Sequence, residues 1–160
     1  MSNPIFPHSA VPITTDKVFP HVHVSDDGNS HSFGLGVIGS LDADSIWRLN
    51  FKLPTDEIPS GTFKLNIDSL AHASTGVAVV NPQWASIANG ESLSDITLND
   101  EGSTSITWTS SDDDAIKTTK IDLDADTPVA GETIFLDLYF LADSWTLTET
   151  STHAVSIIWE

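Results

Sequence analysis

Apolar and polar residues alternate with a period of two along most of the chain. In the stretch SIWRLNFKLP, which begins at Ser45, every second residue from Trp47 is apolar and the residues between are polar. Because successive side chains of a strand point to opposite faces, this alternation predicts an antiparallel strand with one buried and one solvated face. The residues that the same pattern places on inward faces are Trp47, Leu49, Phe51, Leu53, Phe63, Leu65, Ile67, Ile106, Trp108, Thr119, Ile121, Leu123, Ile134, Leu136, Leu138, Phe140, Val155, Ile157 and Trp159.

Runs rich in Asp, Gly, Pro, Asn and Ser separate these strands. Examples are DDGN, PTDEIPSG, NPQWASIANGES, SSDDDA and DADTPVAGE, all with residues typical of turns. Weaker strands fit KVFPHVHV, SFGLGVIG, TGVAVVN and DITLN, and Pro20 restricts the first of these to a sheet edge. Many short strands at this spacing predict an all-β fold, a single jelly-roll-like antiparallel β-sandwich over residues 17–160.

The first 16 residues have a different composition. Pro4, Pro7 and Pro12 stand among small and polar residues, a spacing that disfavours both helix and ladder pairing. Residues 1–16 are therefore predicted to form an extended N-terminal arm, which packs on the domain or reaches a neighbouring subunit.

Charge and cysteine content restrict the possible partners. The chain has 160 residues, with 23 Asp and Glu against 6 Lys and Arg, and a formal net charge of -17. This charge repels phosphate backbones and anionic lipids, so nucleic acid and membrane partners are not expected. Without cysteine, disulfides, thiolate metal sites and cysteine nucleophiles are excluded. We also expect no signal peptide and no membrane span, since the longest apolar run, TIFLDLYFLA, is short and contains Asp137.

Histidines near the start of the sandwich are one candidate metal site. His21 and His23 alternate with valines, so a strand would present both imidazoles on one face, and His31 could return beside them across the DDGN turn. His72 or His153 would complete a ligand set only if the fold brings them close. The glutamate that a cupin-like site needs a few residues later is missing, and an edge or interface role is the alternative.

Acidic clusters are a second candidate. Asp122, Asp124 and Asp126 have the spacing that begins a calcium loop, but Thr127 and Thr133 stand where that loop needs glycine and glutamate. The alternative is a solvated strand face for this group and a solvated turn for residues 112–114. Weak calcium capture stays open.

Tryptophans outside the alternating strands could bind sugars, because flat indole rings stack on sugar rings. Trp84 and Trp145 are the two plausible platforms, and core burial at the sandwich ends is the alternative. No nucleophile with a positioned base, no carboxylate pair and no phosphate-binding glycine loop can be identified. We therefore expect no catalytic, cofactor-binding or metal-binding residues, and no enzyme.

Several phrases resemble small β-sandwich structural proteins of tailed phages, especially marine ones. They are WRLNFKLP, IPSGTFKLNI, NPQWASIANGES, LDADTPVAGE, the ending VSIIWE and the opening PHVHV, in which Val24 replaces a tryptophan. The resemblance covers most of the chain and implies a non-enzymatic virion protein.

The main hypothesis is a capsid decoration protein on the virion surface. It would bind the major capsid protein or neighbouring subunits through its N-terminal arm and one end of its sandwich, and it would form a homo-oligomer, with a trimer favoured. The alternative is a carbohydrate-binding β-sandwich module used for host recognition or in a tail.

Overall fold

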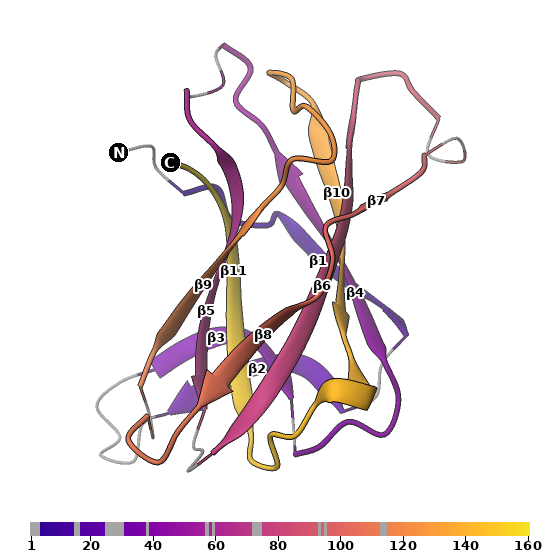
Figure 1. Cartoon of the computed structure of the whole chain (residues 1–160). Coiled ribbons are helices and arrows are strands. Elements are labelled where there is room, and N and C mark those ends of the chain that lie inside the picture. Colours follow the sequence, from indigo (N-terminus) through magenta and orange to yellow (C-terminus); the bar gives the residue numbers. More distant parts are fainter. Residues whose placement is uncertain are drawn as a thin grey trace.

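Two antiparallel β-sheets pack face to face in the computed structural model of the chain (Figure 1). It describes residues 4–14, 17–24, 31–37, 39–56, 58, 60–71, 75–92, 94, 96–112 and 115–160, and only the backbone of residues 14, 21–24 and 31–33. The elements are β1 (Ser9–Thr14), β2 (Val18–Val24), β3 (His31–Val37), β4 (Ser45–Lys52), β5 (Phe63–Ala71), β6 (Gly76–Ile87), β7 (Asn99–Asp100), β8 (Thr104–Trp108), β9 (Lys117–Asp122), β10 (Thr133–Phe140), the short 3-10 helix η2 (Ala142–Ser144) and β11 (Ser151–Trp159). Among these described elements, no helix is long and apolar enough to cross a membrane.

The strand order is that of a jelly roll. Sheet I has the order β2-β3-β11-β5-β9, and sheet II has the order β1-β4-β10-β6-β7, with β8 also paired to β6. From β3 to β6, and again from β9 to β11, the chain changes sheet at each step. Strands that are neighbours in sequence therefore face each other across the core, and the all-β jelly-roll prediction is confirmed. β2 lies at a sheet edge, as Pro20 predicts.

The predicted inward faces form the core between the sheets. Along β4, buried and partly exposed residues alternate, and Trp47, Leu49 and Phe51 have almost no exposed surface. The predicted residues of the other strands are buried as well, except Thr119 on the edge strand β9, which is half-buried. Each fully buried side chain such as Phe51 contributes roughly 1.5–3 kcal/mol relative to exposure, so this apolar layer is the main stabilising element.

The N-terminal segment is extended, but its described part belongs to the sandwich. β1 pairs with β4 from Ser9↔Asn50 to Thr14↔Ile46, with a bulge after Pro12. Before it, Ile5 exchanges two hydrogen bonds of 2.8 Å with Ile157 of β11. Residues 4–14 thus join both sheets, which corrects the predicted division into an arm over 1–16 and a sandwich over 17–160. The backbone hydrogen bonds offered by the edge of β4 stabilise the strand despite its prolines. Pro4 and Pro7 lie on either side of the Ile5 bridge and Pro12 lies at the bulge, so the missing N–H groups cost little.

β6 is longer than the sequence predicts. The segment NPQWASIANGES is expected to be a loop, but its first half continues β6 as far as Ile87. Pro82 is tolerated because of its place: the ladder with β8 ends at Val80↔Thr104, and the ladder with β7 begins at Gln83↔Asp100. The N–H that proline lacks falls at this break, where no neighbouring strand needs it.

Candidate functional site

The predicted histidine site lies mostly outside the described side chains. The strand register places His21 opposite Gly34, His23 opposite Ser32 and His31 opposite Val24, and His72 is not among the described residues. His153 is described, and it lies in the hydrophobic core, where the hydroxyls of Ser69 and Ser151 hydrogen-bond its ring. It is therefore not available to a surface metal site.

The acidic residues of the possible calcium loop have separate partners. Asp122 accepts a hydrogen bond of 2.6 Å from Lys64, whereas Asp126 accepts bonds from the backbone and hydroxyl of Ser86. Asp124 is exposed. Asp112 holds its turn through Thr109 and Lys117, and hydrogen bonds from these two residues lower its pKa to about 2. Within the described ranges, no three His, Asp or Glu side chains are grouped so as to hold a metal ion.

The two tryptophans expected as sugar platforms are buried, so that interpretation is wrong. Trp84 is fully buried on β6, packs against Phe63 and donates a 2.5 Å hydrogen bond to Glu101. Trp145 follows η2, packs on Phe140, and donates to the carbonyl of Leu147. Both indoles are part of the hydrophobic core, and core burial was the alternative to sugar binding.

A different surface combines polar and aromatic side chains: the outer face of sheet II. β10 contributes three successive outward residues, Phe135, Asp137 and Tyr139, which alternate with fully buried leucines. The register places Arg48 of β4 on one side of Asp137 and Gln83 of β6 on the other. A polar row thus crosses the middle of the sheet, with an aromatic residue on either side of it.

In the middle of this face, Arg48 and Asp137 form a planar ion pair. Arg48 donates two hydrogen bonds of 2.7 Å, from Nε and one terminal nitrogen, to the two carboxylate oxygens of Asp137. Asp137 is 5% exposed, and its hydrogen bonds raise the pKa of Arg48, so the guanidinium stays charged. Burial, aided by the carboxylate of Asp137, also raises the pKa of Tyr139, which keeps its phenol protonated at neutral pH.

Further polar atoms extend the row. Gln83 reaches Asp100 of β7 at 3.4 Å, and Asn50 donates to the hydroxyl of Ser9 at 2.8 Å. The side-chain oxygens of Asn50 and Asn81, on this same face, are buried and have no hydrogen-bond partner among the described residues. Such unsatisfied acceptors are uncommon in folded proteins and often mark a position where a ligand or water donates.

The segment between β6 and β7 forms a wall beside this face. Ile96 and Leu98 close a hollow of about 80 Å³ over Arg48 and Phe135. Ile96 also lines a larger open cleft of about 460 Å³ at the end of β6. The other residues of that cleft are Ala85, Ser86, Ile87, Glu91, Ser92, Thr97, Asn99 and Asp126. The polar row therefore has a hollowed, partly apolar border at one end.

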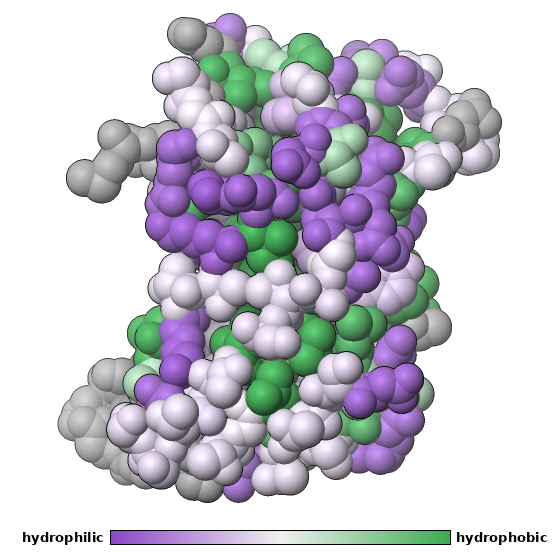
Figure 2. All heavy atoms as spheres, viewed as in Figure 1, coloured by the Kyte–Doolittle hydropathy of each residue, from purple (hydrophilic) through white to green (hydrophobic). Residues whose placement is uncertain are grey.

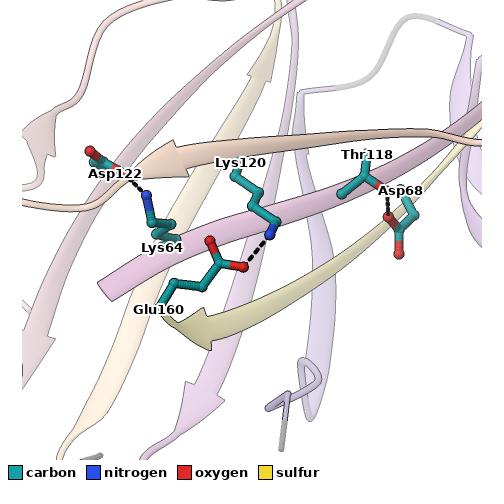
Figure 3. Close-up of polar contacts among 6 residues, drawn as sticks. All are labelled: Lys64, Asp68, Thr118, Lys120, Asp122 and Glu160. Atoms are coloured by element: carbon teal, nitrogen blue, oxygen red, sulfur yellow. Dashed lines mark hydrogen bonds and ion pairs between the residues drawn. The ribbon is translucent and has the colours of Figure 1, made fainter. Parts of the chain in front are cut away.

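The outer face of sheet I is different. Lys64 pairs with Asp122, Lys120 with Glu160, and Thr118 donates to Asp68, so charges from β5, β9 and the chain end neutralise one another (Figure 3). Figure 2 shows the resulting band of hydrophilic residues around the upper part of β9, which continues towards β7. These pairs form an ionic ladder across the face and include no aromatic residue.

Sequence reasoning missed the site on sheet II. In the sequence, Asp137 interrupts an apolar run and Arg48 belongs to a polar strand face, and neither position by itself indicates the partner. A charged residue with apolar neighbours on both sides indicates a buried ion pair, because buried Asp is rare unless it is paired. Its partner is 89 residues away in sequence and could not be identified from the pattern.

No protein-family model and no curated protein matches the chain. Among solved structures, the chain is similar to the carbohydrate-binding module TmCBM61 in complex with β-1,4-galactotriose, at 11% identity over 95% of this chain and 88% of that one, with a TM-score of 0.45. A family 11 carbohydrate-binding module from Clostridium thermocellum, in complex with a β-1,3-1,4-mixed-linked tetrasaccharide, has 16% identity, coverage of 94% and 88%, and a TM-score of 0.47. The glycoside hydrolase domain of Endo-D from Streptococcus pneumoniae R6 has 15% identity over 94% of this chain and 21% of that one, with a TM-score of 0.49. The sugars named here belong to those proteins, and the resemblance to virion proteins stays a prediction.

Proposed function

We propose that the protein binds carbohydrate on the outer face of sheet II and acts as a binding module. The observation that carries this proposal is the planar Arg48–Asp137 pair, set between Phe135 and Tyr139 on the outer face of sheet II. Ligand sites combine apolar and aromatic surface with a few fixed polar groups, and this face has both.

The chemistry suits a polyhydroxylated ligand. Sugar hydroxyls both donate and accept hydrogen bonds, and their C–H faces pack on aromatic rings. The free edges of the Arg48–Asp137 pair and the amide of Gln83 offer donors and acceptors in one row. A hydroxyl that donates to the side-chain oxygen of Asn50 or Asn81 would also remove the cost of an unsatisfied buried acceptor.

The test is glycan binding by matched surface variants. Gln83→Ala and Tyr139→Ala each remove one polar or aromatic contact from the proposed face without opening the core. We expect each to weaken glycan binding about tenfold or more in calorimetry or affinity electrophoresis, since lost contacts of this kind cost 1–2 kcal/mol. Thr118→Ala, on the outer face of sheet I, is the control and should bind like the parent.

Two results would contradict the proposal. One is a glycan array on which the parent chain binds no sugar polymer or oligosaccharide. The other is a glycan that binds equally well to the parent, Gln83→Ala and Tyr139→Ala, because binding would then lie elsewhere.

A virion structural role is the second candidate, and one observation favours it. Phe6, Val11 and Ile13 of the N-terminal segment are at least half exposed. Beside them lies an apolar cleft of about 290 Å³ lined by Pro7, Ala10, Pro20, Leu35 and Leu49 among others. Exposed apolar patches are typical of protein contacts, including the expected trimer or a capsid surface.

This second role predicts stable assembly or particle binding. Phe6→Ser and Ile13→Ser should release the chain from an oligomer or from phage particles, as followed by sedimentation. A monomeric parent chain that binds no particle would exclude it.

A further inference from the structure

We infer that the binding face of sheet II selects uncharged glycans and rejects uronates and sulfated sugars, an inference that rests on the proposed carbohydrate-binding function. Its basis is that Arg48, the cation in the middle of the face, is already neutralised by Asp137, while the rim of the face is acidic.

Every lysine and arginine of the chain is described, and five of the six have a carboxylate partner. Lys17 pairs with Asp42, Arg48 with Asp137, Lys64 with Asp122, Lys117 with Asp112 and Lys120 with Glu160, and Lys52 donates to the carbonyl of Gly131. These are all 6 Lys and Arg residues of the sequence. Figure 3 shows two of these pairs on sheet I, with the ammonium groups of Lys64 and Lys120 directed at the carboxylates of Asp122 and Glu160.

Arg48 is the cation in the middle of the proposed face, and its charge is already balanced by Asp137. Both oxygens of Asp137 occupy its hydrogen-bonding edge at 2.7 Å. A ligand carboxylate or sulfate that took this place would leave Asp137, which is 5% exposed, buried without its counter-charge. Breaking a buried ion pair in this way is strongly unfavourable, so the pair presents hydrogen bonds and no net charge.

The rim of the face adds repulsion. Asp100 is exposed at the end of the polar row, beside Gln83. Glu91 and Asp126 line the adjoining cleft. Their described hydrogen-bond donors are uncharged, and they include the backbone N–H groups of Ala88 and Ser86. Like charges brought together at a binding surface are costly, whereas hydroxyl groups are not affected.

The experiment compares glycans that share a backbone and differ in charge. Suitable pairs are mannan with polymannuronate, galactan with polygalacturonate, and dextran with dextran sulfate, each titrated against the full chain. For each glycan pair whose uncharged member binds, we expect the charged member to have an affinity at least about tenfold lower at physiological salt. The difference should shrink as salt is added, because ions screen the repulsion over about 8 Å at 0.15 M ionic strength.

A pair of variants separates the site from the overall charge. Asp100→Asn removes the exposed rim charge but keeps the side-chain oxygen that accepts from Gly102. Asp68→Asn makes the same charge change on the outer face of sheet I. We expect Asp100→Asn to raise the affinity for the charged member severalfold and Asp68→Asn to leave it unchanged.

The outcomes are distinguishable from a failure of the proposed function. If no uncharged glycan binds and no charged one does, the proposed function is wrong and this inference falls with it. If a charged member binds as well as its uncharged partner, or if both variants act alike, the chain still binds glycan and only the charge selection is overturned.

Discussion

The Nδ1 atom of His153 lies 2.8 Å from the Oγ of Ser69, in the middle of the hydrophobic core. The other ring nitrogen lies 3.0 Å from the Oγ of Ser151, and all three residues are fully buried. The rings of Trp108, Phe140 and Trp145 surround the imidazole. A neutral imidazole has one donor and one acceptor nitrogen, so the two hydroxyls can satisfy it without any charge.

Stability should therefore fall in acid through His153. Burial lowers its pKa to about 3, against 6.5 when the chain is unfolded. Above the unfolded pKa both states are neutral and the full stability is present. Below it the unfolded state takes up a proton that the folded state does not, so the free energy of unfolding drops by up to about 1.4 kcal/mol per pH unit until about pH 3.

Urea denaturation of the parent and of His153→Gln, followed from neutral pH to about pH 4, measures this contribution. Glutamine can bond both serines but does not titrate, so its unfolding free energy should fall less steeply with acid. Equal slopes for the two proteins would show that the carboxylates alone cause any acid sensitivity.

The Arg48–Asp137 pair should show strong coupling in a double-mutant cycle. Arg48→Met leaves a buried carboxylate without its partner, and Asp137→Leu leaves an unpaired guanidinium that can still reach water. We expect a cost of about 2 kcal/mol or more for the first, a smaller cost for the second, and a double variant less destabilised than the sum of both. Chemical denaturation measures all four proteins, and additive effects would contradict the coupling.

Removal of residues 1–14 should destabilise the domain. The sequence predicts an arm outside the sandwich, but the deletion would strip β1 from the edge of β4 and Ile5 from Ile157. Lost apolar burial and lost backbone bonds amount to a few kcal/mol, so the melting temperature should drop by several degrees or more. As a control, Phe6→Ser changes a side chain that is 67% exposed, and it should leave the melting temperature nearly unchanged. An unchanged melting temperature after the deletion would mean that the segment does not hold the sandwich together.

Tryptophan emission should report a dry core. All five tryptophans are at most 6% exposed, including Trp84 and Trp145. The folded protein should emit at short wavelength and resist quenching by acrylamide, and glycan binding should leave the emission unchanged. Quenching or a shift on glycan addition would place an indole at the ligand and would contradict the binding face on sheet II.

Local patterning was sufficient to predict most core residues of the regular strands. Alternation along β4 and β10 already separates Phe51 and Leu136 from their polar neighbours, because the two faces of a strand follow directly from its geometry. Composition alone also predicts an acidic protein and excludes cysteine chemistry. These properties depend on neighbouring residues or on counts, and both are present in the sequence.

Tertiary structure decided everything that depends on pairing between distant segments. Only the register of β4 with β10 brings Arg48 to Asp137, and only packing against the far sheet buries Trp84 and Trp145. The same holds for residues 4–14, which look like a free arm until the open edge of β4 supplies their hydrogen bonds. Strand alternation predicts the face on which a side chain lies. The residues that it contacts there depend on the partner strand, which is set by contacts between segments far apart in the sequence.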